Sequence, residues 1–364
     1  MISFGMTEEQ ELVRDAMRDF AAEVLRPVAR ECDETESISE DLLQSIWELG
    51  LTSTQLPAEF GGGGEPRSSV TNAILLEELA HGDAALAAAA VSPSLFANAI
   101  ADFGSQAQKE RYLPHFCGEK FYPASLAVVE PGPMTEPLKP RTVAERKGEE
   151  WVLSGSKSSV VLGDQAHHFL VLARNDDQVD AFIVDRDAEG VTVSEQELTM
   201  GMKGLPMVGL ELERVHVSAG DRLGEEAGCD VAQILNGTRI GQAAVMLGLS
   251  RAVLEFCVPY SKDRVAFDEP ISKKQSIAFR LAEMHIHVEA LRNLVWQAAS
   301  FLEHGEDATR VSRFARTYAN EHGLWIADNG IQVLGGHGFI REHPVEMWFR
   351  HARTLSVLEG TVAV

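Results

Sequence analysis

The chain has 364 residues, of which 45% are hydrophobic and 24% are charged, and its formal net charge is -23. This length and apolar content are enough for a substantial core in two or three packed units. A surface this acidic repels phosphate backbones and anionic lipids. We therefore expect neither nucleic acid nor a membrane as the main partner, although a local basic cluster could still bind an anionic small molecule.

The cysteines and the first residues indicate a reducing compartment. Cys32, Cys117, Cys229 and Cys257 are far apart and form no Cys-x-x-Cys pair, which predicts reduced thiols with neither a disulfide framework nor a metal site. The chain does not open on a charged stretch followed by an apolar one, and its richest apolar run, residues 84–91, is too short to span a bilayer. We expect a cytoplasmic protein.

Helical signals dominate the first third of the chain. Thr7 and Gln10 match a capping box, and apolar residues follow at helical spacing until Pro27, which is expected to end the helix. Ser37 and Glu40 repeat the capping signal before the next apolar stretch. These patterns predict an N-terminal domain made of helices.

Short β-type runs replace the helical pattern from about Phe121. They occupy residues 151–153, 169–172, 181–184 and 210–215, with glycine or aspartate between them. No long helical pattern separates these runs, so an antiparallel sheet is favoured over a Rossmann sheet.

Helical spacing returns from about Val231 and continues to Leu334. The sequence therefore predicts an α+β protein with three parts. These are an N-terminal helical domain (1–121), a middle antiparallel β domain (122–226) and a C-terminal helical bundle (227–364).

The C-terminal segment carries the most distinctive motifs. Residues 331–339 read Ile-Gln-Val-Leu-Gly-Gly-His-Gly-Phe, and Glu359, Gly360 and Thr361 follow in a predicted irregular segment. A carboxylate in such a loop can sit in an apolar pocket, where it becomes a usable general base. The commoner alternative for a glutamate at this place is a solvated side chain.

These motifs resemble the C-terminal signature of the acyl-CoA dehydrogenase family, together with the Pro-Val-Glu and Arg-x-Ala-Arg segments between them. Further matches follow in family order: Pro-Ala-Glu-Phe-Gly-Gly at 57–62, Glu-Pro-Gly at 130–132, Gly-Ser-Lys at 155–157, Met-Gly-Met-Lys-Gly at 200–204 and Arg-Val-Ala-Phe at 264–267. The resemblance covers nearly the whole chain. The fold that it implies, with a C-terminal four-helix bundle, agrees with the elements predicted from periodicity.

The resemblance implies α,β-dehydrogenation of an acyl-CoA thioester. In the family a carboxylate removes the α-proton while FAD accepts the β-hydride, and an electron-transferring flavoprotein then takes the electrons. Glu359 stands at the position of the family's base, Gly360 lies beside it at the substrate, and Thr361 lies at the flavin. Family members are usually tetramers built from dimers.

One of the family's two cofactor clusters is preserved here. It reaches across a dimer to the neighbour's FAD, and its positions correspond to Arg264, Phe267, Gln275, Gln332 and Gly336. Arg264 suits the pyrophosphate because a guanidinium makes paired charge-assisted hydrogen bonds. The alternative for Arg264 is an ordinary surface cation.

Two further positions are implied to contact the substrate. Arg239 stands where the family keeps an arginine near the thioester, and a buried structural ion pair is an equally good interpretation of it. Thr135 keeps a hydroxyl suited to CoA.

The second cofactor cluster lines the flavin ring in the family, and here the sequence departs from it. Val129 and Val161 each replace a residue with a hydroxyl, and Ser159 replaces a tryptophan that packs on the flavin. The backbone N–H groups of Val129 and Val161 remain as donors. The stacking surface and both hydroxyls are lost.

Two functions are consistent with this pattern. The first is a self-sufficient FAD-dependent acyl-CoA dehydrogenase with Glu359 as its base, in the family's homotetrameric form. The second is a flavin-impaired structural subunit that completes the FAD site of a related chain in a hetero-oligomeric acyl-CoA dehydrogenase, in which Glu359 could be vestigial. A family offshoot that uses the flavin for oxygen chemistry is less consistent with the retained Glu359.

Overall fold

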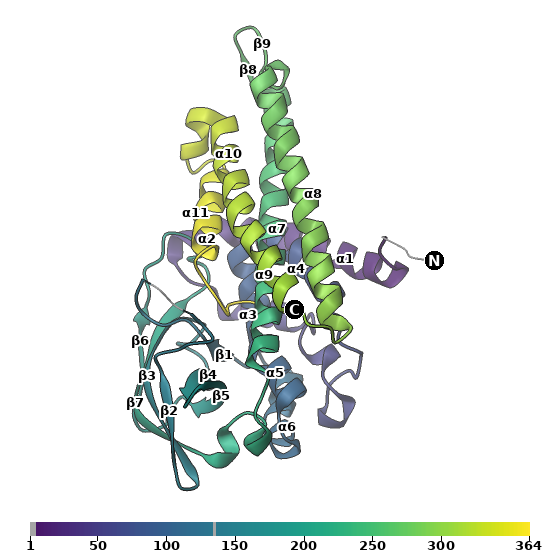
Figure 1. The fold of residues 1–364 in the computed structure, drawn as a ribbon. Coiled ribbons are helices and arrows are strands. Elements are labelled where there is room, and N and C mark those ends of the chain that lie inside the picture. Colours follow the sequence, from purple (N-terminus) through teal and green to yellow (C-terminus); the bar gives the residue numbers. More distant parts are fainter. Residues whose placement is uncertain (1–4, 134–135) are drawn as a thin grey trace.

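In the computed structural model, which describes residues 5–133 and 136–364, a β sheet lies against one end of a set of long helices (Figure 1). The N-terminal helices are α1 (Glu8–Phe20), α2 (Arg26–Thr35), α3 (Glu40–Trp47), α4 (Ser69–Gly82), α5 (Ala84–Phe103) and α6 (Gln106–Tyr112). The predicted order of helical, β and helical parts is confirmed, whereas the boundaries after residues 121 and 226 remain predictions.

The first helical stretch begins as predicted but does not end at Pro27. Thr7 caps α1 with the predicted capping box to Gln10. A π-helical turn, Ala21–Leu25, then leads directly into α2, and Pro27 lies in the first turn of that helix. Proline is accommodated there because the π-helical turn before it already interrupts the regular hydrogen-bond pattern of the α-helix. The prediction that Pro27 ends the helix is wrong for this reason.

The second cap also differs from the predicted one. Ser39, not Ser37, is the N-cap of α3, and its hydroxyl accepts the N–H of Leu42 at 3.2 Å. The Ser37 hydroxyl instead donates to Thr35 Oγ1 at 3.0 Å. A Ser-x-Ser sequence offers two caps two residues apart, and only the position of the helix decides between them.

Within the described residues, seven strands form one sheet in the order β1-β4-β2-β3-β7-β6, with β5 on β4. The strands are β1 (Ala124–Ala127), β2 (Val143–Lys147), β3 (Glu150–Val161), β4 (His168–Asn175), β5 (Gln178–Asp185), β6 (Val191–Gln196) and β7 (Met207–Ser218). The predicted antiparallel pairing holds for β2–β3, β3–β7, β4–β5 and β6–β7. β1 pairs with β4 in parallel, because it enters the sheet from the helical domain rather than through a hairpin.

The C-terminal helices form the predicted bundle. They are α7 (Val231–Asp263), α8 (Gln275–Glu303), α9 (Thr309–Tyr318), α10 (Leu324–Leu334) and α11 (Val345–Leu355), and the hairpin β8 (Val265–Ala266) and β9 (Glu269–Pro270) joins α7 to α8. A π-helical turn, Ala319–Gly323, makes α9 and α10 continuous. Figure 1 shows α7 and α8 running side by side, with β8 and β9 at the end remote from the sheet.

Buried ion pairs join α1, α4, α7 and α8. Glu77 and Glu78 on α4 are 3% and 2% exposed, and Arg251 on α7 binds both carboxylates. Arg292 on α8 binds Glu77 at 2.9 Å, and Arg18 on α1 binds Glu78 at 3.2 Å. A buried charge without a partner costs several kcal/mol, so these pairs favour one arrangement of the helices.

Two helices are long and apolar enough to cross a membrane by length and composition alone. They are α5 and α7, and most of each is buried inside the protein. Because α5 extends the apolar run of residues 84–91 to Phe103, length no longer argues against a span there. The burial of both helices instead marks them as core elements.

The close packing of α4 on α7 predicts different outcomes at two glycines of α7. A Cβ at Gly248 would overlap with the carbonyl oxygen of Glu77, whereas a Cβ at Gly237 would lie 3.8 Å from Leu302 Cδ2. We expect Gly248→Ala to lower the free energy of unfolding by about 2 kcal/mol, because the helices must move apart. Gly237→Ala should not lower it, since alanine favours a helix by about 1 kcal/mol. Chemical denaturation measures both values, and equal stabilities would contradict this packing.

Candidate active site

Glu359 lies in the loop after α11, where two guanidiniums bind its carboxylate. Arg239 of α7 donates through Nε to Glu359 Oε1 at 3.0 Å, and Arg316 of α9 lies with Nη1 2.8 Å from Oε2. The Glu359 side chain is 17% exposed, and the two arginine side chains are 8% and 13% exposed. The fold therefore contains neither the solvated glutamate nor the apolar pocket considered for this position, because two cations surround the carboxylate.

The loop around Glu359 is fastened to α7 and α9 by side chains. Arg316 also donates to the carbonyl oxygen of Leu358 and to Gln242 Oε1 on α7. The amide of Gln242 in turn donates to Thr361 Oγ1 at 2.9 Å. The hydroxyl of Thr361 is thus already engaged within the chain, and residues on both sides of Glu359 are held.

Gly360 brings this loop into contact with the β sheet. Its φ is 73°, a left-handed value that glycine adopts without strain. A Cβ at this position would lie 2.5 Å from Val128 Cγ2, just beyond the end of β1. The structure therefore brings the predicted base next to the Val128–Val129 segment, because only glycine permits so close an approach.

The ring-side residues Val129, Ser159 and Val161 also lie close together. The Val129 carbonyl oxygen accepts the N–H of Ser158 at 2.9 Å, and the buried Val161 ends β3. Ser159 has a φ of 55°, and its N–H and hydroxyl both bind the Glu197 carboxylate at 3.1 Å. A carboxylate thus occupies the donors of the residue that replaces the family's tryptophan.

A buried ion pair holds the segment that carries Val129. Lys157 of β3 has no exposed side-chain surface, and its Nζ donates to Glu130 Oε1 at 3.0 Å. Thr142 donates its N–H and hydroxyl to the same oxygen at 2.8 and 2.6 Å. Burial alone would raise the pKa of Glu130, but these hydrogen bonds and the Lys157 charge lower it to about 2.

The other predicted cluster lies elsewhere, at the end of the bundle. Arg264 caps α7, Phe267 is 88% exposed in the β8–β9 turn, and Gln275 begins α8. Gln332 near the end of α10 and Gly336 just after it are also exposed, so all five residues lie at the surface. Figure 1 places this end of the bundle far from the sheet, and Val129 lies two residues after strand β1 of that sheet. One chain cannot bring the two clusters together, and a second molecule would have to do so.

The two groups of residues implied for FAD differ in how well they fit that cofactor. Among the described residues the Arg264 guanidinium forms no ion pair, so it remains open to a phosphate. The ring side offers Val129 and Val161 without hydroxyls, and Glu197 already binds Ser159. The bundle end therefore fits the dinucleotide part of FAD, whereas the side chains near Glu359 do not fit the flavin ring by themselves.

Arg316 is the residue of this site that the sequence reasoning missed. A signal for it exists, because Ser312, Ala315 and Ala319 are buried at helical spacing and Arg316 falls on the same face. An arginine on a buried stripe requires an anionic partner, which here is Glu359. Arg239 forms a buried ion pair, which was one of its two interpretations, but the partner is the candidate base Glu359. Thr135 lies outside the described residues.

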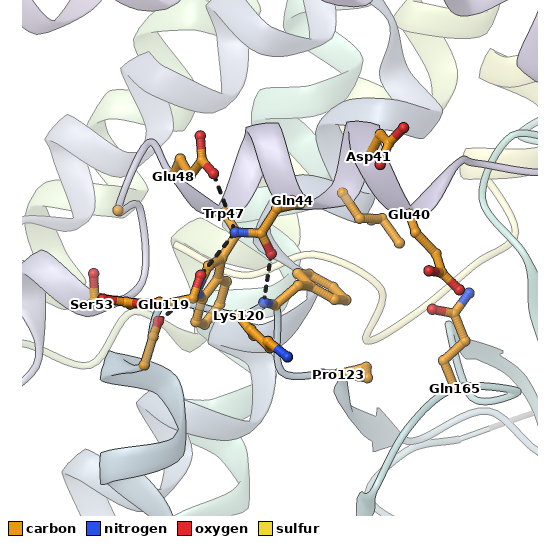
Figure 2. Close-up of a pocket in the computed structure, with 14 residues that line it drawn as sticks. Glu40, Asp41, Gln44, Trp47, Glu48, Ser53, Glu119, Lys120, Pro123 and Gln165 are labelled. Atoms are coloured by element: carbon orange, nitrogen blue, oxygen red, sulfur yellow. Dashed lines mark hydrogen bonds between the residues drawn. The ribbon is translucent and has the colours of Figure 1, made fainter.

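A large open cavity of about 970 Å³ lies between α3 and the segment leading into β1 (Figure 2). Gln44 and Trp47 of α3 lie along it opposite Glu119 and Lys120. Gln44 and Trp47 donate to main-chain carbonyls of the facing segment, each at 2.8 Å. None of the predicted site residues that the structure describes lines this cavity, so it is separate from the Glu359 site.

Comparison with known protein families identifies the three parts of the chain. Models of the acyl-CoA dehydrogenase N-terminal, middle and C-terminal domains match residues 7–120, 125–215 and 227–364. The chain therefore belongs to the acyl-CoA dehydrogenase family, which consists of flavoprotein oxidoreductases.

Similar proteins share this length and fold. The 3-(aryl)acrylate reductase of Clostridium sporogenes is 33% identical over 98% of this chain and 96% of its own. The short-chain specific acyl-CoA dehydrogenase of Megasphaera elsdenii is 33% identical over 99% and 96%. The solved structure of butyryl-CoA dehydrogenase from Megasphaera elsdenii has a TM-score of 0.89 at 31% identity, covering 99% of this chain and 96% of that one.

The lowered pKa of Glu130 predicts an acid-dependent loss of stability. Its folded-state pKa of about 2 lies below the ordinary 4.5, so its stabilisation is present above pH 4.5 and is lost as the pH falls towards 2. Between pH 6 and 3.5 we expect wild type to lose about 1 kcal/mol relative to Glu130→Gln. Urea unfolding at both pH values measures this difference, with the exposed Glu149→Gln as the surface-charge control. A difference independent of pH would contradict the assignment.

Proposed function

We propose that this chain is an FAD-dependent acyl-CoA dehydrogenase in which Glu359 removes the α-proton of an acyl-CoA thioester. The carrying observation is the pairing of one mostly buried carboxylate with two guanidiniums. One of these belongs to Arg239, and its Nη1 is buried without a hydrogen-bond partner among the described residues. A buried donor without a partner is costly, so it supports a ligand oxygen at this place.

Each residue of the site has a role in this proposal. Glu359 takes the α-proton, and Arg239 Nη1 donates to the thioester oxygen, where negative charge develops as the proton leaves. Gly360 lets the loop approach the substrate, and Thr135 binds the CoA part. FAD, when bound, supplies the acceptor for the β-hydride.

The remaining contacts are proposed for the cofactor and the partners. Val129, Ser159, Val161 and Thr361 lie on the ring side of FAD. The pyrophosphate and adenosine contact the bundle end of a second chain through Arg264, Phe267, Gln275, Gln332 and Gly336. Those five positions are exposed, and Arg264 lies 25 residues along α7 from the Arg239 that binds Glu359, so the proposal requires an oligomer. An electron-transferring flavoprotein receives the electrons, and we place the reaction in the cytoplasm.

The contact between Ser159 and Glu197 favours a second candidate function. It leaves the ring side without a stacking surface, whereas the bundle end stays open to a neighbour's cofactor. In that case this chain is a structural subunit that completes the FAD site of a related chain in a hetero-oligomeric acyl-CoA dehydrogenase. Glu359 then keeps its ion pairs without taking part in the reaction.

A visible absorption spectrum of the purified protein separates the two candidates. The first predicts a yellow protein with about one flavin per chain, whose absorbance bleaches when an acyl-CoA such as butyryl-CoA is added. The second predicts a colourless protein that gains flavin absorbance only when it is assembled with a related chain. A colourless protein that FAD and butyryl-CoA leave unchanged would contradict self-sufficient catalysis.

Replacement of the base tests the role of Glu359 directly. Glu359→Gln keeps the size of the side chain but cannot accept the α-proton, so we expect the bleaching rate to fall by about 1000-fold. The exposed Glu342→Gln is the matched control and should bleach at the wild-type rate. Undiminished bleaching by Glu359→Gln would exclude this residue as the base.

A further inference from the structure

We infer that Arg316 is a positioning residue that fixes the Glu359 carboxylate through Oε2, so that Oε1 and Arg239 are the pair that meets the substrate. This inference rests on the proposed role of Glu359 as the base. It assigns unequal tasks to the two guanidiniums that touch the same carboxylate.

Arg316 is bound to the loop as well as to the carboxylate. One of its terminal nitrogens reaches Glu359 Oε2 at 2.8 Å and Gln242 Oε1, and the other reaches the carbonyl oxygen of Leu358. The planar guanidinium therefore spans the side chain of Glu359 and the main chain just before it. Its hydrogen bonds to Gln242 and to the Leu358 carbonyl oxygen hold the guanidinium in place, so its ion pair with Glu359 Oε2 favours one position of the carboxylate.

The helix that carries Arg316 holds the loop at a further point. Asn320, one turn along in the π-helical turn after α9, donates its amide to the carbonyl oxygen of Ser356 at 3.0 Å. The segment from Ser356 to Glu359 is therefore held by side chains of one continuous helix. Rotation of the loop away from α9 would break all of these contacts together.

Arg239 is bound in a different way. It touches Glu359 through Nε, at 3.0 Å, and its Nη1 is buried with no hydrogen-bond partner in the part of the chain that the structure describes. Its remaining donor can therefore bind a ligand oxygen without first breaking a hydrogen bond in the protein. By contrast, both terminal nitrogens of Arg316 already bind oxygens of the protein.

This division of tasks suits proton transfer. Glu359 accepts the α-proton at Oε1 while Oε2 stays on Arg316, and the electron pair of the broken C–H bond moves into the enolate of the thioester. Return of a proton from the acid to the α-carbon restores the thioester. In D₂O the protonated Glu359 exchanges its proton for deuterium before the return step. The cycle then replaces α-hydrogen by deuterium with no net oxidation, so it reports on the base without an external electron acceptor.

The test compares Arg316→Gln, Arg316→Lys and Arg313→Gln. Arg313 is exposed on the same helix one turn earlier, so its variant is the matched control. The readout is deuterium uptake at the α-carbon of saturating butyryl-CoA and 3-phenylpropionyl-CoA, with no electron acceptor added beyond any bound FAD. We expect Arg316→Gln to exchange about 100-fold more slowly at an unchanged thioester Kd, because the base is misplaced rather than lost. Arg316→Lys should recover about 10-fold, since it keeps the charge but not the fork.

A second measurement follows the loop without any substrate. Hydrogen–deuterium exchange of the amides between residues 356 and 361 should be faster in Arg316→Gln than in wild type and unchanged in Arg313→Gln. Wild-type deuterium uptake and wild-type loop protection in Arg316→Gln would overturn the inference. A weaker thioester Kd with an unchanged maximal rate would also overturn it, since that result indicates a role in binding.

Failure of the proposed function gives a different result. If Glu359→Gln exchanges the α-hydrogen as fast as wild type, or if wild type exchanges neither thioester, the assignment of Glu359 as the base is wrong. If Glu359→Gln abolishes exchange while Arg316→Gln leaves it intact, Glu359 remains the base and only the role of Arg316 is wrong.

Discussion

The carboxylates that this protein takes out of water lie beside cations, and the helices and strands are placed accordingly. Glu77 and Glu78 tie α4 to its neighbours through arginines, and Glu130 ties the end of β1 to β3 through Lys157. Glu359 follows the same rule with two guanidiniums. Because an unpaired buried charge costs several kcal/mol, each pair restricts the relative positions of the elements that carry it. The candidate site is thus built from the same interaction that organises the fold.

Helix α7 connects several of these sites along its length. It carries Arg251 for the pairs with α4, Arg239 for the pair with Glu359, and Arg264 at its far end. A helix rises about 1.5 Å per residue, so Arg239 and Arg264 lie roughly 38 Å apart along it. A single chain therefore separates the candidate base from the positions proposed for a dinucleotide. Under either of the two proposed functions, a second chain would unite them.

The ring side of the site shows how local structure limits the chemistry. Ser159 takes a left-handed φ of 55° at the place where the family has a tryptophan, and Glu197 binds both of its donors. Val129 and Val161 line the same region without hydroxyls. The Glu359 carboxylate nevertheless keeps its contact with Arg239, and Gly360 next to it packs on Val128. The residues proposed for proton transfer are therefore different from those proposed for the flavin ring.

The sequence by itself determined the order of helical and β parts, the family and the position of the candidate base, because periodicity and ordered motifs are local properties of the chain. It misplaced the end of the first helix at Pro27 and the cap at Ser37, where the neighbouring turn decides the outcome. Only the tertiary structure brought Arg316 to Glu359, 43 residues further along the chain, and left Arg239 Nη1 without a partner. Contacts between distant residues depend on how the helices pack, and no spacing within one segment encodes them.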